Sequence, residues 1–145
     1  QAEGCCPINR AVVRGGGWEP MEENTFADSI AVGVPRNGDK ALMAIRESRG
    51  LAVNVSDREI MEAQQLLGRS CGVFGEPAGV TATAGVKKLC EQGILGREET
   101  VVSVVTGNGL KDVANAIKAC GEPISIPGDM NALLRAFSDS GIVVE

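Results

Sequence analysis

Two short segments combine glycine with a side chain that can bind a ligand. Residues 106–109 have the sequence Thr-Gly-Asn-Gly and follow an apolar run, while residues 75–79 have the sequence Gly-Glu-Pro-Ala-Gly and follow a shorter one. Glycine allows a flat ligand or a phosphate to approach the backbone closely. Thr106 offers a hydroxyl that can donate and accept hydrogen bonds, and Glu76 offers a carboxylate. These residue types suit a small polar ligand.

The same two segments also have a purely structural interpretation. Residues 106–109 can be a tight turn into a helix, and Glu76 can be a first-turn acid that the helix dipole favours. Neither segment has the Gly-Lys-Ser/Thr ending of a Walker loop or the Gly-x-Gly-x-x-Gly pattern of a dinucleotide site. Composition alone favours the structural interpretation.

Helix and strand signals alternate along the chain. The predicted strands are 51–55, 72–74, 100–105 and 141–144. The predicted helices are 26–32, one that Asp39 caps and Gly50 ends, one that follows a Ser56–Glu59 capping box, one that Glu76 and Pro77 open and Gly93 stops, 110–119, and 130–137 after Asp129. The apolar positions expected to be buried are Leu42, Met43, Ile45, Ile60, Ala63, Leu66, Leu67, Val80, Ala84, Val86, Leu89 and Cys90.

This alternation predicts an α/β fold, a three-layer arrangement in which helical crossovers cover an open, mostly parallel sheet. Ligands of such sheets bind beyond the carboxyl ends of the strands, which is where residues 75–79 and 106–109 fall. We expect residues 1–145 to form a single domain with an irregular lead-in over 1–38, where residues 1–10 show neither a helix start nor a clear strand.

Composition excludes several classes of function. The net charge of −5 and the absence of a basic cluster argue against a nucleic-acid partner. No apolar run reaches the ~18 residues of a membrane span, and no targeting segment is evident. An odd number of cysteines, five, predicts free thiols in a reducing cytoplasm. The absence of histidine removes Ser/His and Cys/His nucleophiles, and with widely spaced cysteines it makes a metal site improbable.

Two motifs together resemble a known family. Glu76-Pro77-Ala78 at the start of a helix, followed downstream by Thr-Gly-Asn-Gly-Leu-Lys-Asp over 106–112, is similar to the carboxyl-terminal part of fold-type-II pyridoxal-phosphate enzymes and, more narrowly, of threonine synthases. The likeness extends over most of the chain. Further similar stretches are 2–7, 32–35, 55–60 and 122–127.

The resemblance implies a role for each site residue. It implies the tryptophan-synthase-β-like fold, pyridoxal 5'-phosphate as cofactor, and a hydrogen bond from Thr106 to the pyridine nitrogen. Gly107 and Gly109 would leave room for the edge of the cofactor ring, and Glu76 would lie near the side of the ring. Asn108 departs from the family pattern, which often has histidine there.

The family's Schiff-base lysine lies in a segment like Ser-Phe-Lys-Asp-Arg, and its phosphate loop resembles Gly-Asn-Thr-Gly; this chain has neither. Its lysines are expected on solvated helix faces, and they are Lys40, Lys87, Lys88, Lys111 and Lys118.

The resulting hypothesis is that the chain is the carboxyl-terminal part of a threonine synthase. The full enzyme would convert O-phosphohomoserine and water to threonine and phosphate, and the chain alone would be inactive without the lysine-bearing N-terminal portion. Open sheet edges and uncovered apolar faces predict self-association or marginal stability of the chain alone, and we expect the full enzyme to be a homo-oligomer. The alternatives are a cysteate synthase, a serine/threonine dehydratase-like enzyme, a non-catalytic module that binds a ligand or partner, and a plain structural domain.

Overall fold

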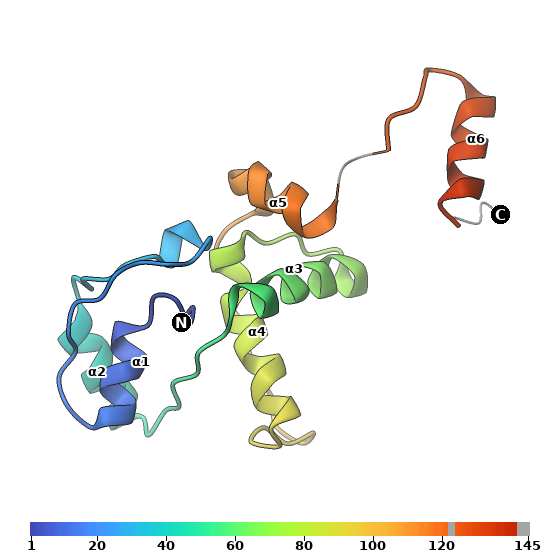
Figure 1. The fold of residues 1–145 in the computed structure, drawn as a ribbon. Coiled ribbons are helices and arrows are strands. Elements are labelled where there is room, and N and C mark those ends of the chain that lie inside the picture. The colour runs from blue at the N-terminus through green and yellow to red at the C-terminus, as the bar shows by residue number, and fades with distance from the viewer. Residues whose placement is uncertain (122–123, 142–145) are drawn as a thin grey trace.

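The structure is a computed structural model that describes residues 1–121 and 124–141, and within these ranges the chain is mainly helical (Figure 1). Helices α3 and α4 pack against each other at the centre, α5 lies against α3, and α1 pairs with α2. The elements are α1 (Pro7–Arg14), η1 (Asp28–Ile30), α2 (Gly38–Glu47), α3 (Asp57–Cys71), α4 (Pro77–Glu91), η2 (Gly109–Asp112), α5 (Val113–Cys120) and α6 (Met130–Asp139), where η marks a 3₁₀ helix.

The described residues contain no β-strand, so the predicted strands are not formed there. The runs 51–55, 72–74 and 100–105 are irregular backbone, and the only pairings near them are isolated bridges. Val55 pairs in parallel with Ala2, and Gly75 pairs antiparallel with Asn108. A strand is stable only when neighbouring strands satisfy its N–H and C=O groups, and the described residues supply no such neighbours. The fourth predicted strand, 141–144, lies outside the described residues apart from Gly141.

The helices with strong local signals form where they were predicted. Ser56 caps α3 in a full capping box, because its hydroxyl accepts a hydrogen bond from the Glu59 N–H at 3.3 Å and its own N–H donates to the Glu59 carboxylate at 2.6 Å. Pro77 occupies the first turn of α4. Asp129 caps α6 by accepting from the Ala132 N–H at 3.0 Å.

Two of the helix predictions for the first half of the chain were wrong. The helix expected over 26–32 is only the 3₁₀ turn η1. Asp39 does not cap α2, because Asn37 occupies the N-cap position. Asp39 lies in the first turn instead, where its carboxylate accepts a hydrogen bond from Trp18 Nε1 at 3.0 Å. The carboxylate of Asp39 thus bonds Trp18, which lies well before it in the sequence, and not the first backbone N–H groups of α2.

Helix α1 lies in the stretch that was expected to be irregular. Pro7 occupies its first turn, and Gly15 ends it in the left-handed conformation with φ 74°. Ile8 and Ala11 are spaced three residues apart on its buried side, where they pack with Leu42 of α2. Each of these signals is present in the sequence, but the helix is too short for periodicity alone to show it.

Two small apolar cores hold the molecule together. The larger one is built around α3 and α4 and includes Ala2, Ala27, Val55, Ile60, Ala63, Val80 and Ala84. The smaller one joins α1 to α2. Three residues expected in the core are exposed, because nothing in the described ranges covers them. These are Met43, Leu66 and Cys90.

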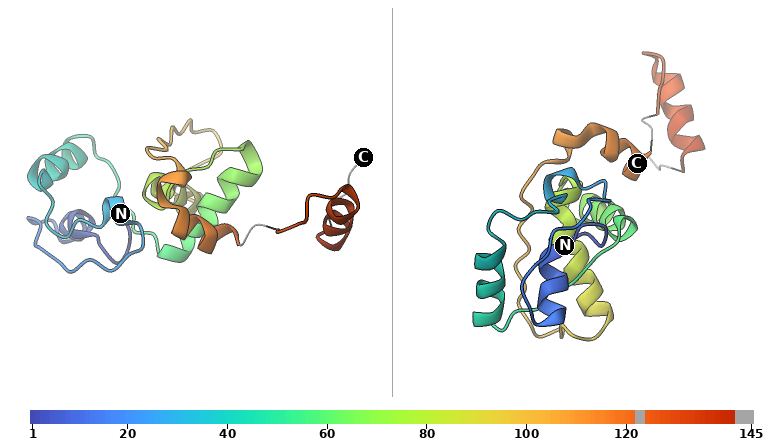
Figure 2. Two further views of the ribbon diagram at one scale, coloured as in Figure 1. Left: turned by 90° about the horizontal axis from the view of Figure 1, so that it is seen from above. Right: turned by 60° about the vertical axis from the view of Figure 1, so that its left-hand side comes forward.

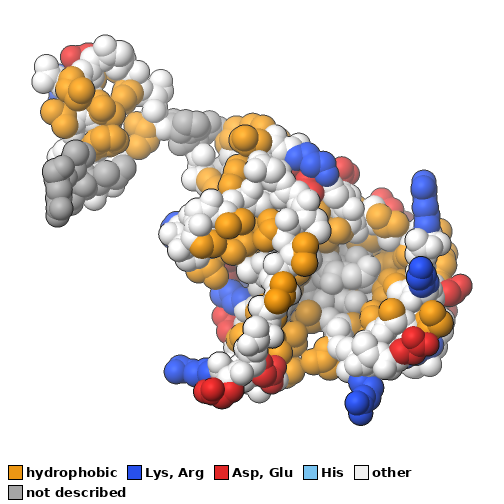
Figure 3. Space-filling model, turned by 180° about the vertical axis from the view of Figure 1, so that it is seen from behind, with side chains coloured by type: hydrophobic (Ala, Val, Ile, Leu, Met, Phe, Trp, Pro, Cys, Tyr) orange, Lys and Arg blue, Asp and Glu red, His pale blue; other side chains and the backbone are white. Residues whose placement is uncertain are grey.

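Much apolar surface remains uncovered. Val102 is 83% exposed and Val104 is 65% exposed. Helix α6 buries none of its residues and stands apart from the other helices (Figures 1 and 2). Viewed from behind, apolar side chains surround the hollow of the body and cover α6 (Figure 3). Among the described residues, no helix has the length and apolar character that crossing a membrane requires.

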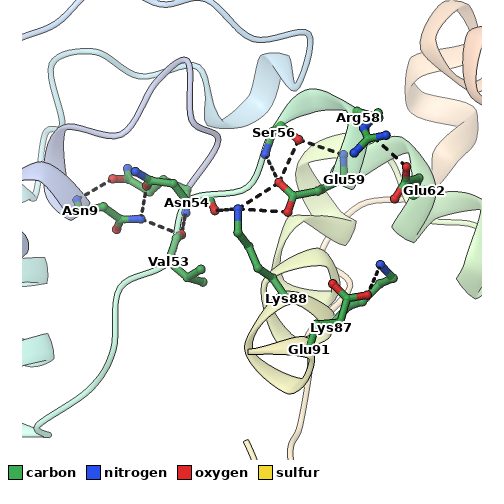
Figure 4. Close-up of polar contacts among 11 residues, drawn as sticks. Asn9, Val53, Asn54, Ser56, Arg58, Glu59, Glu62, Lys87, Lys88 and Glu91 are labelled. Atoms are coloured by element: carbon green, nitrogen blue, oxygen red, sulfur yellow. Dashed lines mark hydrogen bonds and ion pairs between the residues drawn. The ribbon is translucent and has the colours of Figure 1, made fainter. Parts of the chain in front are cut away.

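A polar network joins the start of α3 to the last turn of α4 (Figure 4). The Lys88 ammonium lies 3.0 Å from Glu59 Oε1 and donates to the Asn54 carbonyl at 2.8 Å. Burial opposes ionisation of Glu59, but hydrogen bonds from Ser56 and Lys88 outweigh it and lower the pKa of this carboxyl below its usual value. The sequence predicts Lys88 on a solvated helix face, but its side chain is partly buried against Glu59.

We predict that Ser56→Ala lowers the free energy of unfolding by about 1 kcal/mol, because it removes the hydroxyl that caps α3. Urea denaturation of the purified chain measures this change. Ser70→Ala is the control, since Ser70 is an exposed residue of the same helix that bonds only a backbone carbonyl, and it should cost less than about 0.5 kcal/mol. Equal effects of the two substitutions would contradict the capping role.

We further predict that Glu59 makes the fold sensitive to acid. Its folded pKa is lowered, so its stabilising contribution is present above the ordinary glutamate pKa of about 4.3 and is lost as the pH falls through the lower folded value. The gap in unfolding free energy between wild type and Glu59→Gln should therefore narrow from neutral to acidic pH in urea titrations. A gap that stays constant would show that the charge of Glu59 is not involved.

Candidate functional site

The two glycine-containing segments meet at a short antiparallel bridge between Gly75 and Asn108. The Glu76 N–H donates to the Gly107 carbonyl at 2.9 Å, and the Gly109 N–H donates to the Phe74 carbonyl at 2.9 Å. These two hydrogen bonds place the turn over 106–109 directly against the N-terminus of α4. The structure therefore brings together the predicted site residues, Glu76 on one side and Thr106, Gly107 and Gly109 on the other.

Packing explains why three positions at this junction are glycine. A Cβ atom on Gly79 would lie 2.9 Å from the Gly107 nitrogen, one on Gly107 would overlap the Glu76 side chain, and one on Gly109 would overlap the Phe74 ring. A side chain at Gly79 would push the two backbones apart, and one at Gly107 or Gly109 would displace the Glu76 side chain or the Phe74 ring. Gly107 and Gly109 therefore serve the junction itself, a role that the sequence alone did not reveal.

Thr106 begins the turn and faces outward. The residue is exposed, and its backbone nitrogen lies against Gly79 in the first turn of α4. Within the described residues, no hydrogen bond engages its hydroxyl. The junction therefore fixes the backbone at Thr106 and leaves the hydroxyl available to a ligand.

Glu76 is the buried acid of the site, with only 5% of its surface exposed. It borders a cavity of about 300 Å³ at the start of α4. The cavity is lined by Asp28, Ser29, Glu76, Pro77, Ala78, Lys111, Asp112 and Asn115. Three carboxylates against one ammonium make this lining unsuited to a phosphate group, whereas the neutral Thr106 hydroxyl suits an uncharged ring nitrogen.

Sequence reasoning missed the partner of Glu76. The Lys111 ammonium lies 3.3 Å from Oε1 and 3.3 Å from Oε2 of Glu76, and it also donates to Ser29 Oγ at 3.1 Å. Lys111 had been expected on a solvated face, and its side chain is indeed 62% exposed, but its charged end contacts the buried acid. The position of Lys111 within the 106–112 motif, two residues after Gly109, is the sequence signal that could have indicated this contact.

Comparison with known proteins shows which family the chain resembles. Residues 1–107 match the sequence profile of the pyridoxal-phosphate dependent enzymes. The chain is 45% identical over 139 residues to a threonine synthase of Methanosarcina acetivorans and 47% identical over 141 residues to a threonine synthase of Methanocaldococcus jannaschii. It is also 38% identical over 136 residues to a threonine synthase of Mycobacterium tuberculosis.

These alignments cover 94%, 96% and 93% of this chain but 34%, 35% and 36% of the relatives. The chain thus spans about a third of the length of the curated relatives it matches. The family match supports an α/β fold in general terms and indicates pyridoxal phosphate as the cofactor. Because the match extends over most of its length, the chain belongs to the family of pyridoxal-phosphate dependent enzymes.

Proposed function

We propose that this chain is the carboxyl-terminal part of a threonine synthase, an enzyme that converts O-phosphohomoserine and water to threonine and phosphate with pyridoxal phosphate. The observation that carries the proposal is the hydrogen-bonded junction of the two motifs, which joins Glu76 to Gly107 and Phe74 to Gly109. The similar threonine synthases support it, because their alignments extend over more than nine-tenths of this chain.

Thr106 would bind the pyridine nitrogen of the cofactor. Pyridoxal phosphate, when bound, withdraws electrons from the substrate carbons that react. A neutral hydroxyl does not hold the ring nitrogen protonated as a carboxylate would, so Thr106 would moderate this withdrawal. Its backbone is fixed against Gly79, and the hydroxyl would therefore meet the ring edge at a defined depth.

Glu76, Gly107 and Gly109 would form the wall beside that hydroxyl. The glycines keep the turn free of side chains, so the edge of a flat ring can approach the backbone. Glu76 lies under Gly107 and would face the side of the ring. The acidic lining near Glu76 would repel a phosphate group, which supports a cofactor phosphate site in another part of the enzyme. The Schiff-base lysine would also belong to that other part.

The rest of the enzyme would also complete the fold. We infer that residues 1–145 form part of the large cofactor-binding domain, with 1–38 as its lead-in, and that the apolar runs 51–55, 72–74 and 100–105 join a mostly parallel sheet with helices on both faces. The uncovered Val102 and Val104 support this, since an inner strand would bury them.

Two further features bear on the location and assembly of the enzyme. All five cysteines are free, which supports a cytoplasmic enzyme. The uncovered apolar surface supports a homo-oligomer.

In the complete enzyme, we expect Thr106→Val to lower kcat by about tenfold to a hundredfold, because it removes one hydrogen bond to the cofactor. The absorption maximum of the bound cofactor should shift as well, while the circular dichroism spectrum stays unchanged. Thr106→Ser is the matched control, since it keeps the hydroxyl and should retain most of the activity. Wild-type kcat and absorption in Thr106→Val would rule out this role.

We also expect the present chain, purified alone with added pyridoxal phosphate, to release no phosphate from O-phosphohomoserine. The complete enzyme should release phosphate from O-phosphohomoserine but not from O-phosphoserine, which a cysteate synthase would use. A phosphate assay on both proteins with both substrates measures this. Turnover by the chain alone would contradict the proposal, and a preference for O-phosphoserine would favour the cysteate synthase alternative.

A further inference from the structure

The buried carboxylate of Glu76 draws its counter-charge from Lys111. The Lys111 ammonium is 3.3 Å from each carboxylate oxygen, so it lies astride the group rather than beside one atom. Only 6% of the Glu76 side chain is exposed, whereas 62% of the Lys111 side chain is exposed. A carboxylate at this depth is costly without a charged partner. Lys111 therefore provides what the burial of Glu76 requires.

Lys111 lies in η2, the 3₁₀ helix that continues from the 106–109 turn in which Thr106 lies. Asn108 fixes the turn, because its side chain accepts from the Leu110 N–H at 2.9 Å and its carbonyl accepts from the Lys111 N–H at 3.0 Å. Ser29 of η1 binds the Lys111 ammonium from the other side at 3.1 Å. The side chain of Lys111 thus ties η1, the start of α4 and the 106–109 turn to one point.

Glu76 in turn touches the turn that begins with Thr106. Its carboxylate lies so close to Gly107 that a Cβ atom on Gly107 would overlap it. A rotation of the Glu76 side chain would therefore act on the residue next to Thr106. This contact connects the ion pair to the proposed cofactor-binding hydroxyl.

We propose that Lys111 is a positioning residue of the cofactor site, which holds the Glu76 carboxylate against Gly107 and so fixes the place of the Thr106 hydroxyl. The proposal rests on the proposed function and goes beyond it, because it gives a role to a lysine that does not bond the cofactor. A purely structural ion pair would stabilise the fold without altering how the cofactor is bound.

A double-mutant cycle in the complete enzyme separates these possibilities. The variants are Lys111→Met, Glu76→Gln and the two combined, with Lys111→Arg to restore the charge. Lys87→Met is the matched control, because Lys87 forms a lysine–glutamate pair with Glu91 on the exposed side of α4, at 2.7 Å (Figure 4). The measurements are the dissociation constant and absorption maximum of bound pyridoxal phosphate, kcat and KM, and the unfolding temperature of the cofactor-free protein.

We expect Lys111→Met to raise the dissociation constant of pyridoxal phosphate by about tenfold and to shift its absorption maximum. Because Lys111 acts through Glu76, the double variant should be no worse than Glu76→Gln. Lys111→Arg should recover most of the loss, and Lys87→Met should match wild type in cofactor binding.

Three results would overturn the proposal while leaving the proposed function intact. They are an unchanged dissociation constant and absorption maximum in Lys111→Met, effects of Lys111→Met and Glu76→Gln that simply add, and a loss confined to the unfolding temperature of the cofactor-free protein. A wild-type enzyme that bound no pyridoxal phosphate would instead overturn the proposed function, and this proposal with it.

Discussion

The candidate site depends on two backbone hydrogen bonds, from Glu76 to Gly107 and from Gly109 to Phe74. They join segments that lie far apart in the sequence, and glycine at 79, 107 and 109 is what allows the segments to approach so closely. The junction presents the Thr106 hydroxyl outward and keeps the Glu76 carboxylate inward. Since backbone atoms form the junction, it fixes the main chain beside Thr106, and the Glu76–Lys111 pair, as we propose, fixes the place of the hydroxyl with the precision that a ligand contact requires.

Two lysine–glutamate ion pairs add to the backbone contacts. Two buried or half-buried acids each have a lysine partner, Lys111 for Glu76 and Lys88 for Glu59. The two ion pairs lie in different parts of the molecule and have different roles. The Glu59 pair joins α3 to α4 and supports the framework, whereas the Glu76 pair lies at the cavity beside the 106–109 turn. A lysine–glutamate ion pair thus stabilises the fold between α3 and α4 and, as we propose, positions ligand-binding residues beside the 106–109 turn.

Local signals predicted the local structure well. The Ser56 capping box, Pro77 in the first turn of α4 and the Asp129 cap are confirmed because each depends on a few neighbouring residues. The strands did not form in the described residues because a strand needs partners that a local pattern cannot supply. Lys111 was missed for a similar reason, since its contact with Glu76 arises only when the motifs meet. The site residues named from the motifs do lie together, but their roles stay predictions.

The most direct measurement is a crystal structure of the complete enzyme with pyridoxal phosphate bound. We expect the Thr106 hydroxyl to lie within about 3 Å of the pyridine nitrogen, at hydrogen-bond distance. We also expect Glu76 to lie beside the ring, with the Lys111 ammonium on its carboxylate. A pyridine nitrogen that instead faces a carboxylate, or a cofactor bound away from the 106–109 turn, would contradict the central claim.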